Sequence, residues 1–532
     1  MKESHEVGPS QSPWLQENRL LKTAHGGLYN TDLDRSTLAT DYDMANRLIH
    51  EQENIGAGLK ALSYQYTPDS LRSQLTYPGG TVVAQTYNTH RLLNEVKIGG
   101  VTQASHTYDT ADRPDVRTYV NGTDTDWNFD ANNRVTKLKH ATTGMAPVTF
   151  QEWDYRYSAA DNPLVQDDIT PGLTVHGEAY QYDGLHRVND FKRGTVVANT
   201  VPAPTSFQTW TLSKVGDWDQ WNDNATVDTR THNNIHALTA RSVVPNPQTY
   251  DLNFSQTDDG ANYKFEYDAN DMLQTVRNRV TNAIISQYRY DALNRRVEKN
   301  VGGAITRFYL TGQRVIEERD GADATTAFYT YGTHIDCRLT MDRAGARHYY
   351  HENRMYSTYA MTDNTGAVAE RYAYTAYGVL TTYNAAYGAP QTTSRLGNPY
   401  TFTGRELDSE TLLYDYRGRT YDPVQGRFKQ LDPVGLSGGI NLFEYVKGRP
   451  TVFADSNGTT PDSFDANNPF CGRAACMAIC NAQFNINAAS MAACTYFCHV
   501  YSTLGCNQLY IVCNGEQTWN KMCMYIWTTL CI

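Results

Sequence analysis

The sequence predicts a mainly β protein in which short antiparallel strands stack into one long, coiled sheet, followed by a small Cys-rich tail. The main evidence is a Tyr-Asp-x-x-x-Arg motif that recurs roughly every 20 to 30 residues, a period typical of repeat architectures. Composition agrees, because 38 of the 532 residues are Tyr, which favours half-buried pleated surfaces, and another 38 are Gly, which favours tight turns. The third observation is that the cysteines cluster near the C-terminus.

The motif is clearest at Tyr42–Leu48, Tyr182–Val188 and Tyr290–Arg296. A worn copy is expected at Thr231–Leu238, within the longest gap between recognisable copies. Weaker copies keep the phase and begin at Tyr66, Tyr87, Tyr108, Phe129, Tyr157 and Tyr267. The repetition indicates one small structural unit used many times, which favours a scaffold, shell or binding surface over a small-molecule enzyme.

Each unit is expected to contain two short strands joined by a turn. Alternation such as Tyr180-Gln181-Tyr182 places both rings on one face of a strand, and the Asp-x-x-Asn segment supplies turn chemistry. Pairs such as Gly99-Gly100 predict a second hairpin turn. A stack of hairpins can bury the face that one hairpin leaves bare, so almost no helix is expected before residue 400. We interpret the Tyr and Asp residues as packing and turn groups; a sugar-binding row of Tyr is the alternative.

Charge and hydropathy exclude some classes of function. The net charge is −11 without a basic block, which argues against a nucleic-acid partner. No apolar run approaches the roughly 20 residues of a transmembrane helix, and Met1–Gln11 carries no signal-like apolar core. The chain is therefore expected either to be exported by another route or to be the downstream piece of a longer one. We favour the second interpretation because residues 1–30 look like an interrupted repeat. No cofactor and no metal are expected.

A second pattern follows the repeats. The sequence reads YAYTAYG from Tyr372, NPYTFTGRE from Asn398, LYDYRGR from Leu413 and YDPVQGRF from Tyr421. Together with the repeats, these motifs resemble the RHS/YD-repeat family and its RHS repeat-associated core, over most of the chain. The resemblance implies a spiralling β shell at 31–370 and a core at 371–459 that plugs one end of it. A variable C-terminal domain follows at 460–532, and 1–30 is an irregular N-terminal segment.

The resemblance also implies a function. Shells of this family enclose a variable C-terminal polypeptide, often a toxin, whereas teneurin shells serve cell adhesion. The leading hypothesis is a shell that encloses, and releases by self-cleavage, its own tail as an effector. The alternatives are a cell-surface adhesion or carbohydrate-binding protein with a structural disulfide-rich cap, and an inactive truncated copy. Expected partners are the tail itself and a neighbouring-cell surface, glycan or secretion-system component, with a secreted or cell-surface location.

In many bacterial members, two Asp-Pro-x-Gly-Leu motifs are thought to supply the aspartates of an internal aspartyl protease. The first motif is intact here at Asp432–Leu436. The second, after a spacer of residues 437–454, reads Asp455-Ser456-Asn457-Gly458-Thr459, so Pro and Leu are replaced by Ser and Thr. Neighbouring carboxylates cannot both ionise easily, so one can serve as acid and the other as base.

Asp432 and Asp455 are therefore the candidate catalytic residues, with Arg427 or Arg449 expected to stabilise charge in the transition state. The expected cut lies between Thr459 and Thr460. The simpler interpretation is that both aspartates only close turns.

The tail holds nine of the ten cysteines, and only Cys337 lies outside it. The pairs Cys476/Cys480 and Cys494/Cys498 each lie one helical turn apart, which predicts two antiparallel helices joined by two disulfides in an oxidising compartment. Zinc bound by the same four thiols is the alternative, although zinc sites usually show Cys-x2-Cys spacing. His499 beside Cys498 offers a second, weaker alternative, a thiol–imidazole nucleophile.

Overall fold

The computed structural model describes residues 37–55, 58–173, 176–291, 293–459 and 462–463. Within these residues there are strands and three-residue 3-10 helices but no α-helix, which confirms the prediction of a mainly β fold. Residues 1–30 and the Cys-rich tail from residue 464 on, with Cys476, Cys480, Cys494 and Cys498, lie outside the described residues.

The first sheet has 18 strands, and each strand pairs in antiparallel fashion with the next along the chain. Its strands are β1 (Thr37–Tyr42), β2 (Leu48–Asn54), β3 (Leu59–Tyr66), β4 (Arg72–Thr76), β5 (Val82–Tyr87), β6 (Leu93–Ile98), β7 (Val101–Tyr108), β8 (Pro114–Tyr119), β9 (Thr123–Phe129), β10 (Val135–Thr142), β11 (Thr149–Tyr157), β12 (Pro163–Asp168), β13 (Gly177–Tyr182), β14 (Val188–Gly194), β15 (Ser206–Leu212), β16 (Trp218–Asp223), β17 (Thr226–His232) and β18 (Leu238–Arg241).

The second sheet has 14 strands with the same sequential antiparallel order. Its strands are β19 (Thr249–Tyr250), β20 (Gln256–Asp258), β21 (Tyr263–Tyr267), β22 (Leu273–Asn278), β23 (Ile284–Tyr290), β24 (Arg296–Val301), β25 (Ala304–Thr311), β26 (Arg314–Asp320), β27 (Thr325–Tyr331), β28 (Arg338–Arg343), β29 (Ala346–Glu352), β30 (Thr358–Thr362), β31 (Val368–Tyr374) and β32 (Leu380–Asn384). The boundary predicted between residues 370 and 371 thus falls inside β31.

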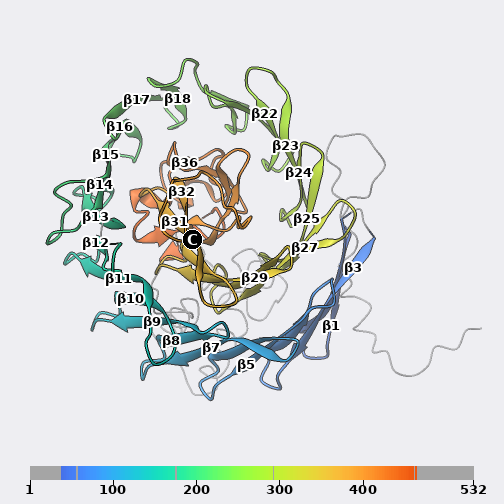
Figure 1. Cartoon of the computed structure of the whole chain (residues 1–532). Helices are drawn as coiled ribbons and strands as arrows, with labels where there is room; N and C mark the ends of the chain where they lie inside the picture. The colour runs from blue at the N-terminus through green and yellow to red at the C-terminus, as the bar shows by residue number, and fades with distance from the viewer. Residues whose placement is uncertain (1–36, 56–57, 174–175, 292, 460–461, 464–532) are drawn as a thin grey trace, which may run out of the picture.

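The two sheets form a spiral, which we call the shell (β1–β32). Figure 1 shows the early strands on the outside of the ring and the last strands, through β27, β29 and β31, passing inside them. Hydrogen bonds join the two turns: the Tyr77 hydroxyl donates to the Tyr329 carbonyl over 2.6 Å, and the Tyr119 hydroxyl donates to the Tyr350 carbonyl over 3.0 Å. The inner turn of the spiral, which carries Tyr329 and Tyr350, therefore covers the inner face of the outer turn, which carries Tyr77 and Tyr119.

The Asp of the repeated motif closes the turn between two strands. In the first copy, Oδ1 of Asp43 accepts the main-chain N–H groups of Ala45 and Arg47, each over 2.9 Å, while Oδ2 accepts Nε of Arg47 over 2.7 Å. The same three-bond arrangement recurs at Asp109, Asp130, Asp183 and Asp291. The predicted turn role of Asp is confirmed, and the motif Arg is its partner.

The Tyr of the motif ties each repeat to the preceding one. The Tyr66 hydroxyl donates to the Leu48 carbonyl over 2.8 Å, and Arg47 lies 5.0 Å from the Tyr66 ring centroid. Equivalent hydroxyl-to-carbonyl bonds are made by Tyr87, Tyr108, Tyr157, Tyr182, Tyr267 and Tyr290. The side chain that marks the period is thus a structural link between neighbouring strands.

The worn copy expected at Thr231–Leu238 forms the same turn with Asn in place of Asp. Oδ1 of Asn233 accepts the N–H groups of Ile235 and Ala237, over 3.1 and 3.0 Å. The second hairpin turn is also present, since Gly99 and Gly100 between β6 and β7 have φ of 56° and 84°. Such left-handed pairs suit a tight hairpin.

Residues 393–459, which we call the plug, lie in the middle of the ring (orange in Figure 1). They contain β33 (Glu406–Asp408), β34 (Leu413–Asp415), β35 (Thr420–Asp422) and β36 (Arg427–Phe428) in one sheet, the 3-10 helices η3 (Phe402–Gly404), η4 (Gly435–Ser437) and η5 (Val446–Gly448), and β37 (Phe453–Ala454), which pairs with β38 (Asp462–Ser463). The plug core is aromatic and buried, and consists of Phe402, Tyr414, Tyr416, Tyr421, Phe428 and Tyr445.

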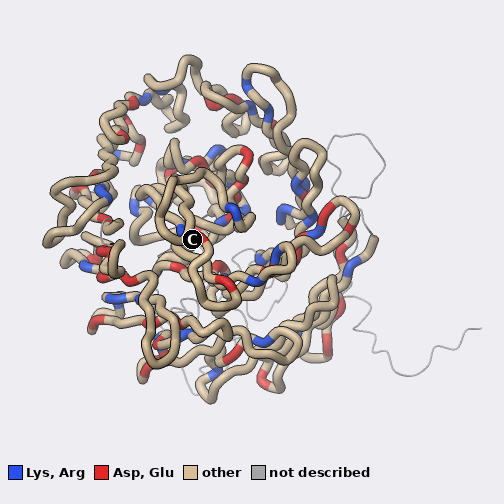
Figure 2. Tube along the Cα trace, in the orientation of Figure 1, with Lys and Arg blue, Asp and Glu red and all other residues tan. Residues whose placement is uncertain are grey.

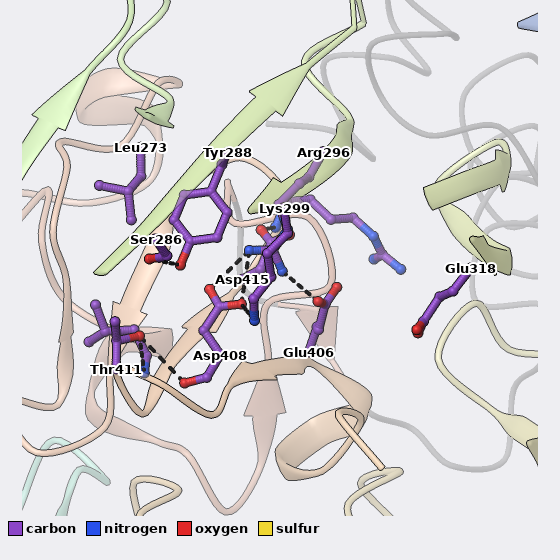
Figure 3. Close-up of polar contacts among 12 residues, drawn as sticks. Leu273, Ser286, Tyr288, Arg296, Lys299, Glu318, Glu406, Asp408, Thr411 and Asp415 are labelled. Atoms are coloured by element: carbon purple, nitrogen blue, oxygen red, sulfur yellow. Dashed lines mark hydrogen bonds and ion pairs between the residues drawn. The ribbon is translucent and has the colours of Figure 1, made fainter. Parts of the chain in front are cut away.

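Buried ion pairs anchor the plug to the shell (Figure 3). Arg296 of β24 contacts Glu406 and Asp408, each over 2.9 Å, and Asp415 over 3.1 Å. Lys299 contacts the same Asp408 over 2.7 Å. Outside this cluster, Figure 2 shows charges of both signs distributed around the ring. A buried ion pair adds little net stability, but removing one partner leaves the other as an unpaired buried charge. This cluster therefore fixes the position of the plug within the shell.

Candidate functional site

Asp432 lies just after β36, where its motif turns into η4. Its main-chain N–H donates to the Leu442 carbonyl over 2.9 Å, and its Oδ1 accepts the N–H of Val434 over 3.0 Å. Gly438 returns close to the carboxylate: a Cβ there would lie 2.8 Å from Oδ2 of Asp432. The Asp-Pro-x-Gly-Leu turn therefore holds the carboxyl group in one orientation.

Asp455 lies just after β37 and organises the second motif in a similar way. Its Oδ1 accepts the N–H of Asn457 over 3.3 Å and that of Thr459 over 2.9 Å. Gly458 has φ of 70°, and a Cβ there would lie 2.5 Å from the Tyr416 carbonyl oxygen. The turn is thus formed with Ser456 and Thr459 in the positions of Pro and Leu.

Arg419, immediately before β35, joins the two aspartates. Its Nη2 lies 3.1 Å from Oδ2 of Asp432 and 3.1 Å from Oδ2 of Asp455. The two carboxylate oxygens are therefore within twice that distance of each other. The same side chain donates from Nε to the Gly458 carbonyl over 2.6 Å and stacks on Phe428, 3.6 Å from the ring centroid.

The two arginines named from the sequence lie elsewhere. Arg427 donates to the His236 carbonyl of the shell, and Arg449 donates to Oδ1 of Asn162, also in the shell, over 3.1 Å. The structure thus places Arg419 between the aspartates, where the sequence suggested Arg427 or Arg449. Arg419 stands in the LYDYRGR motif, but spacing along the chain did not distinguish it from the other plug arginines.

Burial dominates the electrostatics of the site. It raises the pKa of Asp432 to about 6 and raises that of Asp455, while Arg419 opposes both shifts. Burial also lowers the pKa of Arg419, and the two aspartates oppose that shift. A pKa raised in this way suits a carboxyl group that would donate a proton in acid–base chemistry.

The expected cleavage segment begins at this site. Thr459 donates its N–H to Asp455, and Arg419 holds the carbonyl of the residue before it. Thr460 lies outside the described residues. The structure therefore brings together Asp432, Asp455 and Thr459.

The described residues contain no cluster of three or more His, Cys, Asp or Glu side chains arranged to hold a metal ion. Cys337, the one cysteine among them, is buried and unpaired by disulfide. In the same part of the chain, no helix has both the length and the apolar character needed to cross a membrane.

No family model matches the chain. Among curated proteins, it is 25% identical over 381 residues to the tRNA3(Ser)-specific nuclease WapA of Bacillus spizizenii, a match that covers 70% of this chain and 15% of that protein. It is 30% identical over 216 residues to the tRNA(Glu)-specific nuclease WapA of Bacillus subtilis subsp. natto, covering 40% and 9%. It is 29% identical over 219 residues to the double-stranded DNA deaminase toxin A of Burkholderia cenocepacia, covering 35% and 15%.

Solved structures match most of the chain. The crystal structure of TcdB2-TccC3 has a TM-score of 0.66 at 17% identity, covering 80% of this chain and 24% of that one. The Photorhabdus luminescens Tc holotoxin pore has a TM-score of 0.65 at 16% identity, covering 80% and 23%. The fold and the sequence matches are consistent with an RHS/YD-repeat protein. The chain spans less than a quarter of the solved chains and 15% or less of these three curated relatives.

Proposed function

We propose that this RHS chain forms the closing part of a shell that encloses residues 460–532 as an effector and releases them by self-cleavage after Thr459. The observation that carries the proposal is the position of Arg419, which contacts Asp432, Asp455 and the Gly458 carbonyl at once. The relatives, two nucleases and a deaminase toxin, favour a toxic effector over an adhesive cap.

The proposed reaction is hydrolysis of the Thr459–Thr460 peptide bond. Asp455 acts as base and removes a proton from the water that attacks the Thr459 carbonyl carbon. Asp432 acts as acid and gives its proton to the Thr460 nitrogen as the C–N bond breaks. The products are an amine at Thr460 and a carboxylic acid at Thr459, which then loses its proton to solvent. Arg419 stabilises the negative charge on the intermediate. Asp455 is assigned as base because it accepts two main-chain N–H bonds, which favour its ionised form, whereas Asp432 accepts one from Val434.

A separate shell component is part of the proposal. The solved structures pair TccC3 with TcdB2, and this chain covers less than a quarter of the matched chains. We therefore assign the rest of the shell to upstream sequence or to a partner polypeptide. The secreted or cell-surface location follows from the same toxin-like role.

Intact mass of the full chain tests self-cleavage. The wild type should give two fragments, residues 1–459 and 460–532, whose masses add up to that of the full chain plus one water. Asp432→Asn and Asp455→Asn should each give one uncut species. Asp112→Asn, at an exposed turn of the shell, is the matched control and should be cut like the wild type. A single uncut species for the wild type would refute self-cleavage.

The effector role needs a separate measurement. Inducible expression of residues 460–532 in a bacterial host should arrest growth, and the full chain with Asp432→Asn should not. Harmless expression of the soluble tail, together with glycan binding by the uncut chain, would instead support the adhesion hypothesis.

A further inference from the structure

The carbonyl of Ser456, the residue after Asp455, is held by two arginines of the plug. Nη1 of Arg405 donates to it over 2.8 Å, and Nη1 of Arg417 donates to it as well. Both arginines come from the segments that flank β33 and β34. The main chain beside Asp455 is therefore fixed by two guanidinium groups of the plug.

Both arginines are in turn held by one shell residue. Oδ1 of Asp336, in the turn between β27 and β28, contacts Nη2 of Arg417 over 3.0 Å and also Nη2 of Arg405. Asp336 is 1% exposed and Arg405 is 2% exposed. Arg417 is partly buried, and two guanidinium groups that share one carboxylate oxygen in this setting repel each other unless an anion lies between them. Asp336 supplies that anion.

The fit at this contact is close on both sides. Gly404 has φ of 68°, and a Cβ there would lie 2.9 Å from Cβ of Asp336. Arg338, two residues after Asp336, donates to the Gly404 carbonyl over 2.5 Å. Arg417 also donates from Nε to the carbonyl of Gln313, in the hairpin turn between β25 and β26 of the shell, over 3.2 Å. The shell and the plug are therefore in close contact around Asp336 and Gly404.

We propose that Asp336 is a positioning residue for self-cleavage, and that it makes cleavage depend on docking of the inner shell turn onto the plug. The inference rests on the proposed self-cleavage function. Until β27 and β28 are in place, Arg405 and Arg417 repel each other, the Ser456 carbonyl is not held, and Asp455 is not presented to Arg419. The tail, residues 460–532, is then cut only after the shell has formed around the plug.

The test uses Asp336→Asn in the full chain, with Asp408→Asn as its matched control. Asp408 is also buried at the shell–plug contact, where it meets Arg296 and Lys299, but none of its described contacts reaches residues 455–459. Each chain is pulse-labelled in cell-free translation, and appearance of the tail fragment is followed in the protease-resistant, folded fraction at several pH values.

Asp336→Asn should slow cleavage in the folded fraction by about tenfold or more, because Asp455 and the main chain next to it are no longer held in position for the reaction. The dependence of its cleavage rate on pH should also move to higher pH, because Asp455 loses its contact with Arg419, the cation that favours its ionised form. Asp408→Asn should lower the folded yield while its folded fraction keeps the wild-type rate and profile.

Three outcomes are distinct. Wild-type cleavage with unchanged rate and profile in Asp336→Asn would overturn the positioning role alone. Equal slowing by Asp336→Asn and Asp408→Asn would overturn it too, because it would assign the effect to docking in general. Absence of cleavage in the wild type would refute the proposed function itself.

Discussion

Nη2 of Arg419 lies 3.1 Å from Oδ2 of Asp455, and both side chains are buried in the plug. The same nitrogen is equally close to Asp432, so one guanidinium group holds the two candidate catalytic carboxylates. A planar guanidinium can contact several acceptors at once, which an ammonium group cannot do with the same geometry. The predictions about cleavage begin from this contact.

Arg419→Lys should slow self-cleavage by about 10- to 1,000-fold, because an ammonium cannot hold both carboxylates and the Gly458 carbonyl together. Arg427→Lys is the matched control, since Arg427 contacts the His236 carbonyl of the shell. Its cleavage should stay near the wild-type rate. The measurement is the time course of tail release on a gel, and equal slowing in the two variants would contradict a special role for Arg419.

The cleavage rate should fall as pH rises through about 6, because burial raises the pKa of Asp432 to that value and the proposed acid must carry a proton. Pulse-labelled chain shifted into buffers below and above this pH supplies the measurement. A rate that instead increases through the same range would assign Asp432 as the base and exchange the two roles.

Tyr290→Phe should destabilise the shell by about 1–2 kcal/mol, because the Leu273 carbonyl loses the hydroxyl that donates to it over 2.8 Å. Chemical denaturation of the uncut Asp432→Asn background gives the value. Tyr→Phe at Tyr66, which donates to the Leu48 carbonyl over 2.8 Å, should cost a similar amount. A loss below a few tenths of a kcal/mol at both positions would show that ring packing alone accounts for the motif Tyr.

Gly426→Ala should displace the plug, because a Cβ there would lie 2.0 Å from Cη2 of Trp218 in the shell and Gly426 has φ of 69°. The matched control is Gly303→Ala, where φ is 93° but the space is open, so only backbone strain of about 1 kcal/mol is expected. Soluble yield and unfolding midpoint distinguish the two. Equal effects would mean that the contact with Trp218 does not hold the plug.

The sequence predicted those parts of the fold that depend on local chemistry. Asp43 closes a turn with residues two and four positions away, and Tyr66 reaches the adjacent strand, so their period is visible along the chain. The pairing of Asp432 with Asp455 followed from a family motif. Arg419 did not, because it lies 36 residues before Asp455, and only the path of the plug shows which arginine reaches both aspartates.

Contacts between shell and plug were beyond prediction for the same reason. Arg296 and Asp408 are 112 residues apart, and nothing in their local sequence marks them as partners. Their pairing depends on how far the spiral turns before the plug begins, which is the sum of many small strand rotations. The disulfides, zinc alternative and helices of the tail remain predictions.

The hydrogen bond between Tyr119 and Tyr350 spans 231 residues of chain, and that separation has a kinetic consequence. Most shell strands pair with the next strand along the chain, but this contact closes a long loop, so the entropy of loop closure is lost before the contact compensates for it. During synthesis, the outer turn leaves the ribosome with its apolar inner face bare and waits for the inner turn to arrive. The inner face of the outer turn therefore stays uncovered until the strands that carry Tyr329 and Tyr350 have been made.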